Sequence, residues 1–257
     1  RSTPLYSSAA SDVYMRQGKW RPRPGRWIKE PIWPSSNITS RIFYLSQNGL
    51  SSSRDSGDKN INTPQNLGLT SGHNCPGMRI ENELPDDQRR DDLISVCFDS
   101  EPLSEDLEVL GAPKLEIEFS ADKPDAYLIA RICEVSPDGV SERVSFRPIN
   151  LSHHISHEFP EKLSPGKFYK VAFDLNHCGW RLKKGNKLRL ALSTTYWPII
   201  WPVPEVVNVK LNLRNCCLIL PQRRKGLNQD IDKDQSLDNI TPTMKHKTNL
   251  YFVQFEL

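Results

Sequence analysis

The sequence has no run of apolar residues long enough to cross a membrane, and it carries almost no excess charge. Its 34 Lys and Arg residues stand against 31 Asp and Glu, which leaves a net charge of +3. This balance gives no reason to expect nucleic acid or a membrane surface as a partner. Lys19–Trp27 mixes basic and aromatic residues, but its prolines favour an extended linker that lies on a surface.

Closely spaced cysteine pairs of the Cys-x-x-Cys type are also missing. Six scattered cysteines in 257 residues do not form a disulfide framework, so we expect a reducing, cytoplasmic location. Secretion stays an alternative, because Asn37, Asn150 and Asn239 each begin a glycosylation sequon. The chain starts at Arg1 with neither a Met nor a signal-like segment, and we expect it to be a mature or truncated piece.

The common motifs of catalysis are absent as well. There is no Gly-x-Ser-x-Gly elbow to present a nucleophilic serine, no phosphate-binding Walker loop and no dinucleotide fingerprint. We therefore name no catalytic, cofactor-binding or metal-binding residue, and we expect no cofactor.

Three polar stretches share some features with metal sites. His153 and His157 are four residues apart, but the prolines that follow them favour a surface loop. Asp86–Asp92 gathers carboxylates such as Ca²⁺ binds, but its alternating charges favour a self-paired, solvated turn. His73 and Cys75 make a metal pair only if two more ligands come from elsewhere in the chain.

What the sequence does have is strand-like alternation. Apolar and polar residues alternate over Lys187–Leu192 and over Val207–Leu213. Tyr127–Val135 is apolar on both faces, which predicts a central strand, and Pro137–Gly139 predicts a hairpin turn after it. Further strands are predicted at Arg41–Ser46, Leu93–Asp99, Leu107–Ser120, Arg143–Asn150, Tyr169–Leu175, Cys217–Leu220 and Leu250–Leu257.

About nine or ten strands without helical periodicity predict an all-β sandwich of jelly-roll type with few short helices. Residues 1–35 look irregular, and we expect them to be a linker that precedes a sandwich domain over residues 36–257. Loops are expected at Gln47–Thr63 and Arg223–Lys247, which are rich in polar residues.

An aromatic, proline-rich loop joins the strands predicted at Lys187–Leu192 and Val207–Leu213. Proline has no N–H for a strand ladder, so this segment is not a central strand. One interpretation buries its rings over the end of the sandwich core. The other exposes them to a neighbouring domain or a ligand cleft. The candidate interface or cleft residues are Tyr196, Trp197, Trp201, His73 and Cys75.

Several short motifs occur in an order that resembles one family. They are Pro24–Trp27, Trp33–Pro34, Leu69–Cys75, Glu83–Asp92, Phe98–Pro113, Asn150–His153, Leu163–Gly166, Gly185–Leu190 and Tyr196–Pro202. The set is similar to the C-terminal domain of the CocE/NonD hydrolases, the family of X-prolyl dipeptidyl peptidase and cocaine esterase. The resemblance runs from about Pro24 to Leu220, and the tail after Arg224 does not match.

The resemblance implies an α/β-hydrolase domain with a Ser-Asp-His triad, a helical cap, and a β-domain of galactose-binding-like jelly-roll shape. All three triad residues would lie upstream of Arg1, so none carries over to a residue of this sequence. This chain would then be the non-catalytic part of a serine hydrolase of the dipeptidyl peptidase or esterase type. It would pack on the catalytic domain and help to wall its substrate cleft.

Two other functions stay open. One is a free-standing carbohydrate-binding module, in which exposed rings among Tyr196, Trp197 and Trp201 stack on sugars. The other is a structural piece that forms a homo-oligomer. If the chain instead packs on a catalytic domain, we expect Trp201→Ala to cost about 3–5 kcal/mol of stability or docking energy, as for the deletion of a large buried ring.

Overall fold

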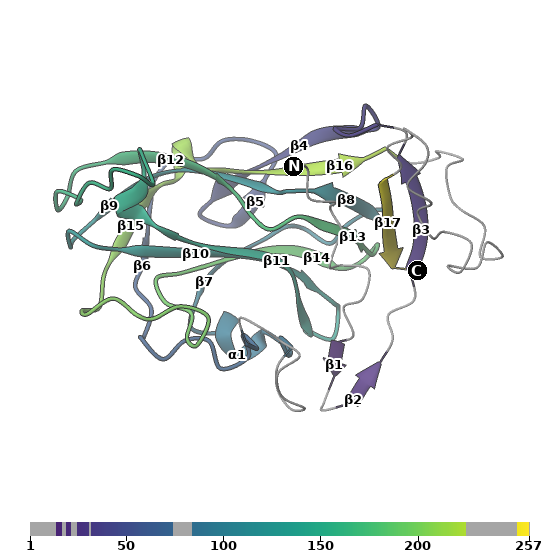
Figure 1. Cartoon of the computed structure of the whole chain (residues 1–257), viewed down its shortest axis with the longest axis horizontal. Coiled ribbons are helices and arrows are strands. Elements are labelled where there is room, and N and C mark those ends of the chain that lie inside the picture. Colours follow the sequence, from purple (N-terminus) through teal and green to yellow (C-terminus); the bar gives the residue numbers. More distant parts are fainter. Residues whose placement is uncertain are drawn as a thin grey trace.

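Two antiparallel β-sheets pack face to face in the computed structural model of the chain (Figure 1). The described residues are 32–73 and 84–224, together with short strands at 14–16, 19–21, 25–30 and 251–256. The predicted all-β sandwich with few short helices is confirmed.

The smaller sheet has four strands in the order β11–β10–β14–β7. Their bounds are β7 (Val96–Asp99), β10 (Tyr127–Val135), β11 (Ser141–Asn150) and β14 (Lys187–Ser193). The predicted central strand is confirmed, because β10 pairs with β11 on one side and β14 on the other. The predicted hairpin turn before β11 is also present, with Gly139 at a φ of 84° that glycine readily adopts.

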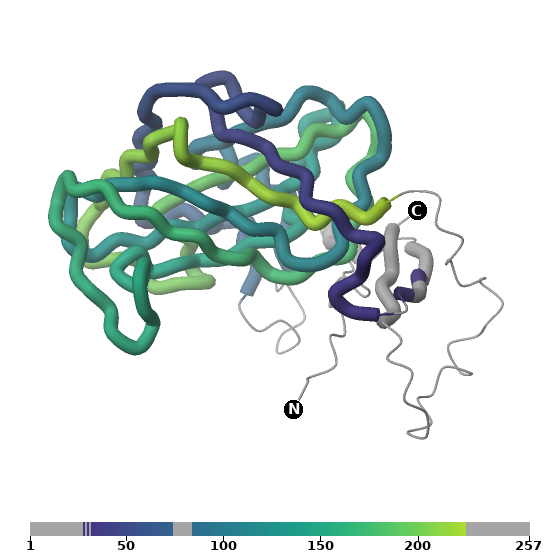
Figure 2. Tube along the Cα trace, turned by 90° about the horizontal axis from the view of Figure 1, so that it is seen from above, coloured from purple at the N-terminus to yellow at the C-terminus, as the bar shows by residue number. Residues whose placement is uncertain are grey.

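The larger sheet follows the order β13–β8–β16–β9–β15–β6, with β12 beside β9 and β4 between β16 and β5. The bounds are β4 (Ile38–Ser46), β5 (Gly49–Ser51), β6 (Asp58–Ile61), β8 (Leu107–Gly111), β9 (Lys114–Ala121), β12 (Tyr169–Asp174), β13 (Cys178–Leu182), β15 (Val209–Asn212) and β16 (Cys217–Arg223). Figure 2 shows β4 as a purple-blue tube beside the yellow-green β16, although the two are far apart in sequence.

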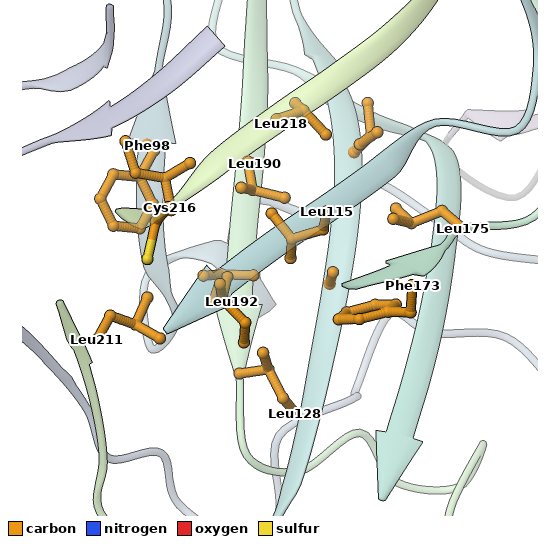
Figure 3. Close-up of a cluster of buried hydrophobic side chains, with 14 of the residues drawn as sticks. Phe98, Leu115, Leu128, Phe173, Leu175, Leu190, Leu192, Leu211, Cys216 and Leu218 are labelled. Atoms are coloured by element: carbon orange, nitrogen blue, oxygen red, sulfur yellow. The ribbon is translucent and has the colours of Figure 1, made fainter. Parts of the chain in front are cut away.

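The core lies between the two sheets. In β9, Leu115, Ile117 and Phe119 are buried, and the charged residues between them are partly exposed, as the alternation predicts. Leucines of both sheets meet there (Figure 3): Leu128, Leu190 and Leu192 from the smaller sheet and Leu115, Leu211 and Leu218 from the larger one. Each such side chain contributes about 1.5–3 kcal/mol through its burial.

The outer face of the smaller sheet is also covered. Three segments lie over it, at residues 63–73, 84–95 and 194–206, and we call them together the covering layer. Its one helix, α1 (Arg89–Asp92), lies on the side of β10 and β14 that faces away from the larger sheet (Figure 1). The burial of Ile129 against Leu67 and Tyr196 shows that this outer face is a second, smaller core.

Several predicted boundaries are wrong, each for a local reason. The strand predicted at Leu93–Asp99 begins only at Val96, because Leu93 ends α1. The strand predicted at Leu107–Ser120 is two strands, β8 and β9, since Pro113 cannot donate to a ladder. The loop predicted at Gln47–Thr63 contains β5 and β6.

The N-terminal segment is also less irregular than predicted. β1 (Tyr14–Arg16) pairs with β2 (Lys19–Arg21), and β3 (Gly25–Glu30) pairs with β17 (Tyr251–Glu256), which confirms the strand predicted at Leu250–Leu257. The Glu30 carboxylate is buried 2.7 Å from the Arg223 guanidinium. Burial alone raises the pKa of Glu30, but hydrogen bonds from Ser35, Arg223 and Asn37 outweigh it and lower that pKa.

The division into a linker over residues 1–35 and a sandwich over 36–257 stays a prediction. Most of the loop predicted at Arg223–Lys247 lies outside the described residues. Two short 3₁₀ turns also occur among the described residues, η2 (Leu151–His153) and η3 (Leu213–Asn215). In the part of the chain that the structure describes, no helix is both long and apolar enough to span a membrane.

A matched pair of substitutions tests where the core lies. Leu190 is fully buried between the sheets, and Leu93 is 86% exposed on the covering layer. Leu190→Ala should lower the free energy of unfolding by about 2–5 kcal/mol, because it removes packed methyl groups and leaves a cavity. Leu93→Ala should change it by less than about 0.5 kcal/mol. Urea unfolding of both variants measures this, and equal losses would contradict the assigned core.

Candidate functional site

The covering layer is held to the smaller sheet by charged side chains that have no access to solvent. Arg131 lies in the middle of β10, points to the outer face and is fully buried. Its guanidinium contacts the Asp92 carboxylate at 3.0 Å and donates to the Gln88 side-chain oxygen at 2.9 Å. Asp92 and Gln88 both belong to the segment around α1, so these two contacts hold the segment against β10.

The Asp92 carboxylate joins several parts of the fold. Its second oxygen lies 3.0 Å from Arg189 of β14 and accepts a 2.6 Å hydrogen bond from the Ser141 hydroxyl of β11. Arg189 in turn makes two hydrogen bonds of 2.6 and 2.7 Å to Asp99 of β7. These bonds to Asp99 raise the pKa of Arg189. Opposite charges are thus paired across the width of the sheet, as buried charges require.

Asp91 joins two segments of the covering layer. Its side chain is fully buried and accepts the backbone N–H groups of Gly68, Leu69 and Thr70, each at 3.0 Å. A carboxylate that accepts several backbone N–H groups is a strong organiser of a turn. The interpretation of Asp86–Asp92 as a solvated, self-paired turn is therefore wrong for its last two aspartates.

Tyr196 closes the layer from the other side. It is fully buried, and its hydroxyl accepts from Arg143 at 2.6 Å and donates to the Gln88 side-chain oxygen at 2.9 Å. Burial raises the pKa of Tyr196, so the phenol keeps its proton and remains a donor. The interpretation that buries the aromatic loop is confirmed for this ring.

The two tryptophans of the loop are exposed, whereas Tyr196 is buried. Trp197 is 41% exposed and Trp201 is 76% exposed, and their rings meet edge to face with centroids 5.0 Å apart. Tyr196 before them and Val203 after them are both buried. The loop therefore has fixed ends and holds its two largest rings outward.

The turn at residues 67–70 supports this loop directly. The Trp197 N–H donates to the Leu67 carbonyl at 2.7 Å. Gly68 has a φ of +125°, and a Cβ atom there would lie 1.8 Å from the Trp197 carbonyl oxygen. Only glycine fits at this position. Leu69 next to it is 65% exposed, so it adds an apolar side chain to the same layer.

The remaining candidates divide as follows. His73 is exposed at the end of the 63–73 segment, and Cys75 lies outside the described residues, so their pairing stays a hypothesis. Burial raises the pKa of Cys97, Cys133 and Cys178 to about 12, so these thiols are not nucleophiles near neutral pH. Over the described ranges, no three or more His, Cys, Asp or Glu side chains are grouped to hold a metal ion.

The sequence analysis did not predict that Leu69 and Leu93 are exposed, and it did not predict the buried charged residues of the same layer. One feature of the sequence does indicate the buried charges. Arg131 is a charged residue in the middle of an apolar strand, and a buried guanidinium needs a carboxylate partner. The aspartates of Asp86–Asp92 were the densest supply of such partners in the chain.

The sequence is similar to those of a known domain family and a known enzyme. A family model described as the X-Pro dipeptidyl-peptidase C-terminal non-catalytic domain matches residues 7–246. Cocaine esterase from Rhodococcus sp. (strain MB1 Bresler) is 23% identical over 189 residues, which make up 67% of this chain and 32% of that protein. The chain thus spans about a third of the length of this relative.

Solved structures share the fold at low sequence identity. An aminopeptidase from the marine sediment archaeon Thaumarchaeota archaeon has a TM-score of 0.66 at 15% identity, covering 82% of this chain and 39% of its own. An α-amino acid ester hydrolase has a TM-score of 0.62 at 18% identity, covering 72% and 36%. A CocE/NonD family hydrolase from Staphylococcus aureus has a TM-score of 0.57 at 16% identity, covering 82% and 40%.

The buried charge pair gives a direct test of how the covering layer is held. Asp92→Asn removes the charge that neutralises Arg131, and we expect it to lower the free energy of unfolding by about 3–5 kcal/mol. Asp86→Asn changes an exposed residue of the same motif and should shift that free energy by less than about 0.5 kcal/mol. Urea unfolding curves compare the two, and indistinguishable midpoints would contradict the assigned role of Asp92.

Proposed function

This chain belongs to the family of X-Pro dipeptidyl-peptidase C-terminal non-catalytic domains, and from this premise we propose that its covering layer packs on an α/β-hydrolase catalytic domain. In this position the tryptophan loop would help to wall the substrate cleft and keep water from the reacting centre. The larger enzyme would hydrolyse an ester or amide through a serine nucleophile on the partner domain.

The observation that carries the proposal is the exposure of large apolar side chains on the covering layer, whose segments are joined by hydrogen bonds. The six are Leu69, Leu93, Ile94, Trp197, Trp201 and Val206. Exposed tryptophans surrounded by apolar residues are typical anchors of protein interfaces. All six belong to segments that are joined by the hydrogen bonds of Asp91 and by the Trp197–Leu67 hydrogen bond.

The rigidity of the layer also favours docking. The Gln65 side chain donates to the Val203 carbonyl at 2.6 Å, and the Thr63 and Thr194 hydroxyls are 2.8 Å apart. These contacts hold both ends of the tryptophan loop before any partner arrives. A preformed surface loses less conformational entropy when it binds, so more of the contact energy appears as affinity.

The exposure of Trp201 changes the effect expected for its substitution by alanine. Because its ring is 76% exposed, its deletion removes little packing within this chain, and a stability cost of about 3–5 kcal/mol is not expected. The cost should appear in docking instead.

A carbohydrate-binding module is the second candidate, and the outward position of Trp197 and Trp201 is the observation that favours it. Sugar rings stack on open aromatic faces, whereas these two rings meet at an interplanar angle of 82°, edge against face. This arrangement leaves less open ring face than a stacking platform needs. Binding on a glycan array that is lost in Trp201→Ala would support this alternative over docking.

A docking measurement tests the proposal. Trp201→Ala should weaken binding of the chain to the α/β-hydrolase domain of the same enzyme by at least about 2 kcal/mol, or roughly 30-fold in Kd. Phe159→Ala removes a ring that is 70% exposed on a loop outside the covering layer, and it should leave Kd unchanged. Isothermal titration calorimetry gives both values, with light scattering to detect any homo-oligomer. Equal affinity of wild type and Trp201→Ala would refute the proposed surface.

A further inference from the structure

We propose that His153 and His157 form a two-histidine binding site for a transition-metal cation such as Zn²⁺. The two rings lie in the loop between β11 and β12, outside the covering layer. Their Nδ1 atoms are 3.2 Å apart, and the ring centroids are separated by 5.4 Å. The site is independent of the proposed docking function, because it shares no residue with the tryptophan loop.

The separation of the two nitrogens matches metal coordination. Zn²⁺–N bonds are about 2.0–2.1 Å long, so two imidazole nitrogens on one tetrahedral ion lie about 3.3–3.4 Å apart. The observed 3.2 Å falls just below this value. A single ion can therefore bridge the two rings with a shift of a few tenths of an ångström.

The loop holds the two histidines together through its backbone. Asn150 caps the 3₁₀ turn η2 by accepting from the Ser152 N–H at 3.0 Å. The Glu161 N–H donates to the Ser152 carbonyl at 2.9 Å and closes the loop around both histidines. The Ser156 hydroxyl accepts the N–H groups of the two residues after His157, each at 3.1 Å.

The adjacent histidine is turned away from this pair. The His154 Nδ1 lies 3.1 Å from the Leu151 carbonyl, and its ring packs on Tyr169 with centroids 4.5 Å apart. This loop thus offers two histidine ligands, in agreement with the finding that no group of three or more metal-binding side chains occurs among the described residues. His157 is exposed and His153 is half-buried, so water can fill the remaining coordination positions.

The chemistry of the pair selects the kind of cation. Imidazole nitrogens suit Zn²⁺, Cu²⁺ and Ni²⁺, whereas Mg²⁺ prefers oxygen ligands. Without metal, the same 3.2 Å separation serves a hydrogen bond in which one Nδ1 carries the proton. Binding through both Nδ1 atoms requires that this proton move to Nε2 of the same ring, with no net loss of a proton from a neutral pair.

Titration of the untagged chain with ZnCl₂ in a calorimeter tests the site, with MgCl₂ as the control cation. We expect one Zn²⁺ per chain and no Mg²⁺ binding. His153→Gln and His157→Gln should each weaken Zn²⁺ binding by more than about tenfold, because one of two protein ligands is lost. His177→Gln changes another exposed histidine and should leave the affinity unchanged.

Two further measurements separate loss of the site from loss of the fold. Circular dichroism should show the same spectrum for all variants, and His157→Cys should restore Zn²⁺ binding, since thiolate is a Zn²⁺ ligand. The proposal is overturned if the wild type binds no Zn²⁺, or if His157→Gln binds it as tightly as the wild type does.

Discussion

The structure depends on a positive charge that is placed where only apolar side chains are expected. Arg131 lies on the outer face of the central strand β10, shielded from water. A guanidinium in this position is tolerable only with a carboxylate partner, and Asp92 supplies it at 3.0 Å. This requirement forces the segment around α1 to lie on the smaller sheet. The sandwich therefore gains a third, partial layer with its own buried contacts.

This layer links the fold to the proposed docking function. Asp91 orders the turn at residues 68–70, that turn receives the Trp197 backbone, and the loop ends are buried at Tyr196 and Val203. The backbone of the loop is therefore held in place by these contacts, and the two tryptophan rings are exposed on it. A rigid apolar surface on a non-catalytic domain fits the task of supporting a second domain.

Much of the fold could be predicted from alternation alone. The period-two pattern in β9 and β14 and the double-sided apolar run in β10 depend on local side-chain directions, which a sequence displays. The order of short motifs also identified the family. Boundaries were less accurate where a single residue such as Pro113 decides where a strand ends.

The site could be predicted only in part, because its properties depend on distant partners. The burial of Asp91 and Asp92 cannot be inferred from a run of alternating charges, since Arg131 lies about forty residues away. The same limit applies to the aromatic loop, where one ring is buried and two are exposed although the three belong to one motif. The close approach of the His153 and His157 rings likewise depends on the folding of their loop.

Hydrogen–deuterium exchange of the chain, alone and bound to the α/β-hydrolase domain that we propose as its partner, tests the central claim most directly. The covering layer should form the contact, so amides at residues 68–73, 89–95 and 197–203 should exchange more slowly in the complex. Exchange on the outer face of the larger sheet, along β4 and β12, should not change. Protection of β4 and β12 without protection of the covering layer would contradict the account.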